Sequence, residues 1–136
     1  MPEGRPPRGL LDTSVVVDLE AIDPAQLPIE VAVSTLTMAD LAAGPHATTD
    51  PEERARRQDR LQRAEAAFDG LPFDREAARA YGRVYSAVAA VGRKARGARA
   101  VDLLVAATAS AADLPLYTRN GSDFEGLSEV VAVVVV

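Results

Sequence analysis

Four aspartates occupy positions at which a protein chain can deliver carboxylates to a reaction centre. Each one ends an apolar run or stands inside an otherwise uncharged helical segment: Asp12, Asp40, Asp102 and Asp123. If they converge they repel one another, because two like charges about 4 Å apart cost about 4 kcal/mol at an effective dielectric constant of about 20. Such a site requires bound protons or a divalent cation. We expect the other three aspartates to gather around Asp12.

The composition restricts which cation could be held. The 136 residues include no cysteine and a single histidine, His46, which is expected to be an ordinary surface residue. Disulfides and thiolate metal sites are therefore excluded, and carboxylate oxygens are the main available ligands. Oxygen ligands favour a hard cation, so we predict Mg²⁺, with Mn²⁺ as the alternative. Such an ion would orient and activate a water molecule and neutralise charge developing on a phosphate.

Each aspartate also has a purely structural explanation. Asp12 would cap the helix that follows it, and Asp40 comes three residues after Thr37, at the spacing of a capping box. Asp102 would complement the positive end of a helix dipole. Asp123 would stabilise a turn or cap a short helix. Only convergence of the four distinguishes the catalytic interpretation from these local ones.

The charge is unevenly distributed along the chain. The net charge is −5, yet residues 52–99 carry 12 of the 15 basic side chains and 7 of the 20 acidic ones. A basic segment beside an acidic remainder suits a metal-dependent enzyme that acts on phosphates, since cations bind the backbone while acids hold the metal. A solvated, arginine-rich helix face would give the same pattern.

Apolar runs and helix signals alternate along the chain. Ser14 and Thr37 are predicted to start helices, and the uncharged run 130–136 must be a buried strand, because exposed it would promote aggregation. Tyr81 and Tyr85 are predicted to lie on a core stripe rather than to stack on bases. Strands are predicted at 9–12, 29–35, 71–73, 114–118 and 130–136, and helices at 15–20, 37–44, 51–70, 74–92 and 101–112, with a brief helical piece at 123–127 and a basic loop at 93–99.

This alternation predicts an α/β fold with a mainly parallel sheet of four to five strands and helices on both faces. In such sheets ligands bind beyond the carboxyl ends of the strands. Asp12 and the loop 118–123 follow strands, and Asp40 and Asp102 are predicted in the first turns of helices that start at the same edge. We expect one domain, 9–136, after a flexible proline-rich N-terminus, 1–8. Without a signal peptide or an apolar run of membrane-spanning length, a cytoplasmic location is predicted.

Four blocks in order resemble PIN-domain ribonucleases, most closely the VapC toxins of type II toxin–antitoxin systems. They are residues 10–14 (LLDTS), 34–41 (STLTMADL), 102–109 (DLLVAATA) and 117–124 (YTRNGSDF). The resemblance implies a three-layer α/β/α fold, endoribonuclease activity with Mg²⁺ or Mn²⁺, a cognate antitoxin and a homodimer. It assigns metal binding and catalysis to Asp12, Asp40, Asp102 and Asp123. One departure is Asp40, since the family usually has glutamate there, which reaches about 1.5 Å further.

Three functions are compatible with these patterns. The first is a toxin that hydrolyses RNA phosphodiester bonds with a metal-activated water. The alternative is a catalytically weak PIN-like module that binds protein or RNA. The third is a small phosphotransferase of the haloacid-dehalogenase or receiver type, which also places an aspartate after its first strand. Two observations argue against the phosphotransferase. Ser14 stands where the haloacid-dehalogenase type needs a second acid, and the only lysine, Lys94, precedes the central helix.

Overall fold

A five-stranded sheet forms the centre of the molecule. The computed structural model describes residues 7–92 and 98–136, so residues 93–97 of the expected basic loop and residues 1–6 of the expected flexible N-terminus lie outside it. The strand order is β3-β2-β1-β4-β5, and every neighbouring pair is parallel, as predicted. The strands are β1 (Arg8–Leu11), β2 (Glu30–Ser34), β3 (Gly70–Leu71), β4 (Leu116–Thr118) and β5 (Val133–Val135).

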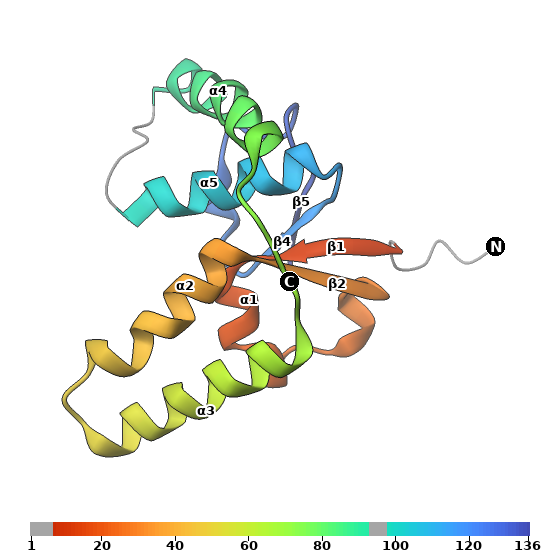
Figure 1. The fold of residues 1–136 in the computed structure, drawn as a ribbon. Coiled ribbons are helices and arrows are strands. Elements are labelled where there is room, and N and C mark those ends of the chain that lie inside the picture. Colours follow the sequence, from red (N-terminus) through yellow and green to blue (C-terminus); the bar gives the residue numbers. More distant parts are fainter. Residues whose placement is uncertain (1–6, 93–97) are drawn as a thin grey trace.

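Helices cover both faces of this sheet. Figure 1 shows α4 and α5 on one side of the strands and α1 and α3 on the other, which is the expected three-layer α/β/α arrangement. The helices are α1 (Thr13–Val17), α2 (Thr35–Ala43), α3 (Pro51–Ala67), α4 (Arg75–Ala90) and α5 (Ala98–Ala111), with short 3₁₀ turns η1 (Leu19–Ala21), η2 (Pro24–Gln26), η3 (Gly44–Ala47) and η4 (Gly121–Phe124). Within the described ranges, no helix is long and apolar enough to cross a bilayer.

The alternation of β1 divides the core between the two faces. Successive side chains of a strand point to opposite sides. Leu10 packs with Val84 of α4 and Leu103 of α5, whereas Leu11 packs with Val15 of α1 and other residues of the second face. Both leucines are fully buried. The first strand is therefore anchored on both sides, which fixes the position of the residue that follows it.

The order of the strands reverses at β1. The chain passes from β1 to β2 on one side and returns on the other side of β1 as β4. In open parallel sheets the crevice outside the carboxyl ends, at the point where the strand order reverses, is the usual ligand site. Asp12 N–H donates to Tyr117 O at 3.0 Å, which joins the ends of β1 and β4 at this point.

Three helices, α1, α2 and α5, begin earlier than the sequence predicted, and α5 begins at Ala98. Asp12, and not Ser14, caps α1, because its carboxylate accepts from Val15 N–H. Ser34 caps α2, since its hydroxyl accepts from Leu36 N–H at 3.0 Å. The predicted N-cap at Thr37 is thus wrong, and the capping-box explanation of its downstream aspartate is wrong with it.

This shift also moves two of the aspartates along their helices. Asp40 is the sixth residue of α2, and Asp102 is the fifth residue of α5. Both lie in the second turn, whereas the first turn was predicted. Stabilisation by the helix dipole fades within the first turn. The structural explanation for Asp102 is correspondingly weaker.

Three other expectations about the chain were wrong. Val135 is 60% exposed and Tyr85 is 54% exposed, although both were predicted in the core. The strand β5 is short and pairs with β4 alone, so one of its edges is open. The buried residues of α4 are Ala77, Ala80, Val84 and Val88, which leaves Tyr85 outside the stripe. Arg8, expected in the flexible terminus, belongs to β1 opposite Glu30.

Candidate active site

Asp12 is held rigidly at the end of β1. It is only 5% exposed, and its Oδ1 accepts from Ser14 Oγ at 2.6 Å and from Val15 N–H at 3.1 Å. These two bonds involve one of the carboxylate oxygens. The capping role and a functional role are therefore compatible, because capping fixes the carboxylate without needing its Oδ2 atom.

Hydroxyl groups connect the ends of β1 and β4. Ser14 Oγ accepts from Arg119 N–H at 3.0 Å while it donates to Asp12. Thr118 Oγ1 lies 3.5 Å from Ser14 Oγ and accepts from Asn120 N–H at 3.0 Å. Ser14 and Thr118 thus position the carboxylate and the loop after β4.

The carboxyl of Asp102 has a raised pKa. Burial and then the negative charges of Asp123, Asp12 and Asp40, in that order, raise the pKa from 3.8 to about 6, while Arg99 opposes the shift. All three predicted partners therefore act on one half-buried carboxyl. The local explanations do not account for this influence of three acids on a fourth, and convergence of the four aspartates would produce it.

Asp40 is exposed and is attached to the segment after β1. Its Oδ2 lies 3.1 Å from Thr13 Oγ1, which in turn lies 3.1 Å from Thr37 Oγ1. Thr37 is fully buried. Thr37 was not predicted to have a role at the site, although its spacing of three residues from Asp40 places both on one helix face.

Asp123 is connected to α5 through its backbone. It lies in η4, and its carbonyl oxygen accepts from Arg99 Nη1 at 2.8 Å. Arg99 and Asp102 are three residues apart on α5 and so share a face. The sequence placed Arg99 in a basic loop and missed this contact, although the i, i+3 spacing from Asp102 was visible.

The donor set fits a hard divalent cation. In the part of the chain that the structure describes, no group of three Asp, Glu, His or Cys side chains is arranged so that it could hold an ion by itself. A Mg²⁺ site does not need three, because protein sites commonly supply one or two carboxylates and leave the remaining positions to waters and substrate phosphates. Burial and the repulsion from the other aspartates both raise the pKa of Asp102, and a bound cation would offset both effects.

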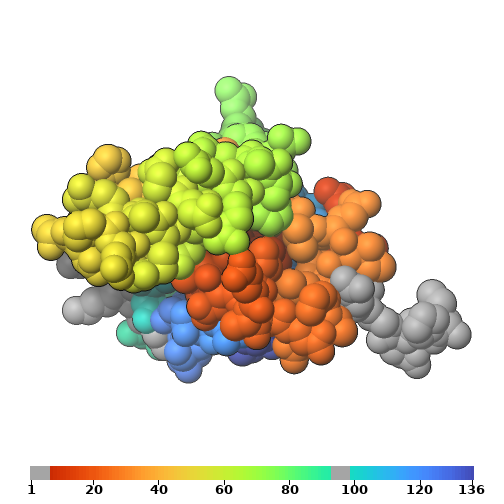
Figure 2. Space-filling view, turned by 90° about the horizontal axis from the view of Figure 1, so that it is seen from below, coloured from red at the N-terminus to blue at the C-terminus, as the bar shows by residue number. Residues whose placement is uncertain are grey.

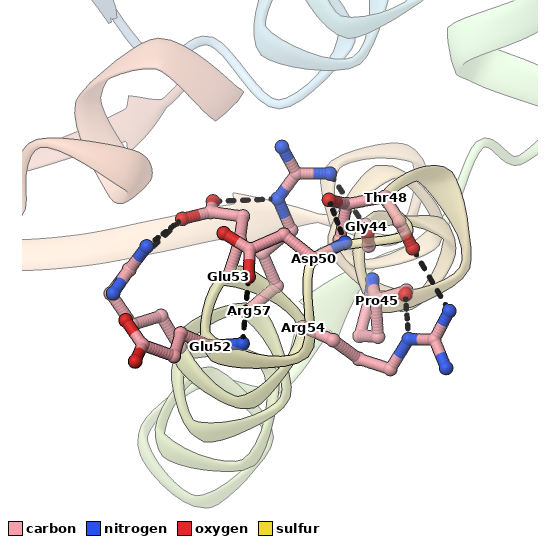
Figure 3. Close-up of polar contacts among 9 residues, drawn as sticks. Gly44, Pro45, Thr48, Asp50, Glu52, Glu53, Arg54 and Arg57 are labelled. Carbon is pink, nitrogen blue, oxygen red and sulfur yellow. Dashed lines mark hydrogen bonds and ion pairs between the residues drawn. The ribbon is translucent and has the colours of Figure 1, made fainter.

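The arginines of α3 are mostly occupied with the protein itself. Arg54 donates to the carbonyls of Pro45 and Thr48, and Arg57 donates to Gly44 O at 2.9 Å (Figure 3). These contacts fasten the turn between α2 and α3. These two arginines therefore stabilise the fold, a role that neither explanation of the basic segment predicted.

The remaining arginines of α3 border a groove away from the aspartates. Arg56 pairs with Glu53, and Arg63 pairs with Glu20 and Asp59. Figure 2 shows α3 alongside the α1–η1 segment on this face, and a cavity of about 440 Å³ lies between them. None of the four aspartates lines it. Its lining combines arginines and acids with Val16, Val17, Leu19, Ala64, Ala67 and Phe68.

Comparisons with known proteins agree with this geometry. Residues 9–130 match the family model of the PIN domain. The chain is 34% identical over 134 residues to Ribonuclease VapC5 of Mycobacterium tuberculosis, with 96% of each chain covered. It is 36% identical over 110 residues to Ribonuclease VapC8 of the same organism, covering 80% of this chain and 96% of that protein.

A solved structure extends the agreement to three dimensions. The crystal structure of VapBC-5 from Mycobacterium tuberculosis, described as a member of the VapBC family of toxin–antitoxin systems, superimposes with a TM-score of 0.82 at 34% identity. The match covers 96% of this chain and 98% of that one. Family model, sequence identity and fold therefore give one answer: the chain belongs to the PIN-domain family.

Proposed function

We propose that this chain is a metal-dependent endoribonuclease that acts as the toxin of a type II toxin–antitoxin system. The observation that carries the proposal is the half-buried Asp102, whose pKa is raised by burial and by the charges of three further aspartates. The ribonuclease names of its relatives support the reaction class. They favour this function over the phosphotransferase alternative.

Within this proposal, Asp12 and Asp102 hold Mg²⁺ or Mn²⁺, and Asp123 and Asp40 complete the site directly or through water. The bound cation supplies an activated water and neutralises charge on the phosphate. Ser14 fixes the Asp12 carboxylate, to which its hydroxyl donates at 2.6 Å. Arg99 holds the η4 segment that carries Asp123 by donating to its carbonyl.

An antitoxin protein is the proposed partner. The solved relatives include VapBC toxin–antitoxin assemblies, some of them bound to DNA. The groove between α1–η1 and α3 supports a protein partner, because apolar side chains such as Val17, 40% exposed, line a hollow bordered by charges. A homodimer and a cytoplasmic location remain predictions.

The proposal is tested by titrating Mg²⁺ and Mn²⁺ against cleavage of a defined RNA by purified protein. We expect ion-dependent cleavage that chelation abolishes, and a loss of at least about 100-fold in Asp12→Asn and Asp102→Asn, because each removes a charged ligand. Asp59→Asn is the matched control, since Asp59 is exposed and paired with Arg63 on α3.

Two outcomes contradict the nuclease proposal. Full activity of Asp12→Asn would show that the Asp12 carboxylate takes no part in the mechanism. RNA binding without cleavage at any ion concentration would favour the alternative, a catalytically weak binding module. Induced expression with and without the product of the adjacent gene tests the toxin role, with mapping of RNA ends. We expect growth arrest that the neighbour relieves and that Asp102→Asn lacks.

A further inference from the structure

The second acidic position carries the shorter side chain, and a hydroxyl group contacts it. Asp40 Oδ2 lies 3.1 Å from Thr13 Oγ1. Thr13 directly follows Asp12 and is the first residue of α1, whereas Asp40 belongs to α2. This contact therefore joins the two helices beside the carboxyl end of β1.

The direction of the hydrogen bonds follows from counting protons. Thr13 has one hydroxyl proton and lies 3.1 Å from two oxygens, those of Asp40 and Thr37. A carboxylate only accepts, and a bond to a charged acceptor is the stronger one. Thr13 is the donor in both contacts, and its one proton favours the charged oxygen of Asp40 over the hydroxyl of Thr37. The Thr13 hydroxyl thus lies between the buried Thr37 and the Asp40 carboxylate.

We propose that Thr13 is a positioning residue that orients the short Asp40 carboxylate beside the carboxyl end of β1, in place of the reach that a glutamate would have. This inference rests on the proposed nuclease function. Thr37, which is fully buried, holds the Thr13 hydroxyl in place by accepting from it. Partners that orient the ligands of a metal typically change ion affinity or activity by about 10-fold to 100-fold when removed.

The contact of Thr13 with Asp40 leads to a prediction that would not follow if Thr13 had only a structural role. A glutamate at position 40 carries its carboxylate one methylene further, past the hydroxyl of Thr13. Asp40→Glu should therefore keep substantial activity and should no longer depend on Thr13. In the native Asp40 background, the same hydroxyl should matter.

The experiment combines Thr13→Val and Thr13→Ser with Asp40 and with Asp40→Glu. Two quantities are measured: the rise in melting temperature on addition of Mn²⁺, which reports ion binding without catalysis, and cleavage of a defined RNA. We expect Thr13→Val to need about 10-fold more Mn²⁺ for the same rise in melting temperature and to cleave RNA about 10-fold more slowly. Thr13→Ser should restore both quantities. In the Asp40→Glu background we expect Thr13→Val to change neither. Thr108→Val is the matched control, since Thr108 Oγ1 donates to Leu104 O within α5.

Three results would overturn the inference. One is an unchanged Mn²⁺ response in Thr13→Val, and another is an equal loss from Thr13→Val in both backgrounds. The third is a native protein that neither responds to Mn²⁺ nor cleaves RNA, which removes the proposed function as well and is thereby distinguishable from the first two. The melting temperature without ions verifies folding, and Thr13→Ala replaces Thr13→Val if the latter fails to fold.

Discussion

Two charged regions of this molecule treat their charges in opposite ways. At the carboxyl edge of the sheet, burial and the negative charges of Asp123, Asp12 and Asp40 together raise the pKa of Asp102. On α3, arginines are matched to acids or carbonyls, as in the contact of Arg57 with Glu53 at 2.8 Å (Figure 3). We call the first region frustrated, because its like charges act on one another without a neutralising ion pair among the described residues. We call the second compensated, because its charges are paired.

The contrast separates function from support. Charges that the fold neutralises by itself, such as those of Arg54 and Arg57, stabilise the turn between α2 and α3. Charges that the fold brings together without neutralising them cost stability and persist only where they serve a ligand or a reaction. A dense charge run in a sequence does not tell these two cases apart.

The largest expected effect is on the frustrated side. Asp102→Asn should abolish cleavage and yet raise the stability of the ion-free protein at pH 7 by about 1 kcal/mol, after allowance for the screening of a half-exposed group. The reason is that the raised pKa of Asp102, about 6, marks its charge as unfavourable in the folded state. Calorimetric melting without ions measures the change.

The sign of the pH dependence follows from the same shift. Between about pH 4 and pH 6 the folded protein holds a proton on Asp102 that the unfolded chain releases, so this group makes the free energy of unfolding fall as pH rises through that window. Asp102→Asn should flatten this part of the profile. Ion binding should show the reverse trend, because protons compete with the cation below pH 6. A profile that the substitution leaves unchanged would contradict the assignment.

A moderate effect is expected on the compensated side. Arg57→Met removes the bond to Gly44 O and the pair with Glu53, and should destabilise the protein by about 1 kcal/mol while leaving the cleavage rate per folded molecule unchanged. Chemical denaturation and the cleavage assay measure the two quantities. Arg56→Met is the control, since Arg56 contacts Glu53 alone among the described residues and is more exposed. A loss of cleavage in folded Arg57→Met would show that this arginine binds substrate.

The smallest effect is expected at the surface pairs. Arg63→Gln breaks the contacts of Arg63 with Glu20 and Asp59, all of which are mostly exposed. Exposed pairs contribute little and are screened by salt, so we expect a loss below about 0.5 kcal/mol that disappears at about 1 M salt. Denaturation curves at two salt concentrations test this. A loss of several kcal/mol, or one that salt does not reduce, would place this pair among the essential contacts.

The elements of the fold were largely readable from the sequence. The parallel sheet and the approximate ranges of α3 and α4 follow from local patterns of apolar residues and helix signals. Errors arose where two cap candidates stood close together, as with Asp12 and Ser14. The exposure of Tyr85 and Val135 was also missed, because periodicity indicates a face but does not say whether another element covers it.

The sequence by itself determined which residues could do chemistry, because an oxygen-only ligand set and aspartates at the ends of apolar runs are properties of residue type and order. It also determined the approximate edge of the sheet at which they lie. The tertiary structure alone decided which charges stay uncompensated, since that depends on distances between segments far apart in the chain. The same is true of the contacts of Thr13 with Asp40 and of Arg99 with Asp123, which no local pattern encodes.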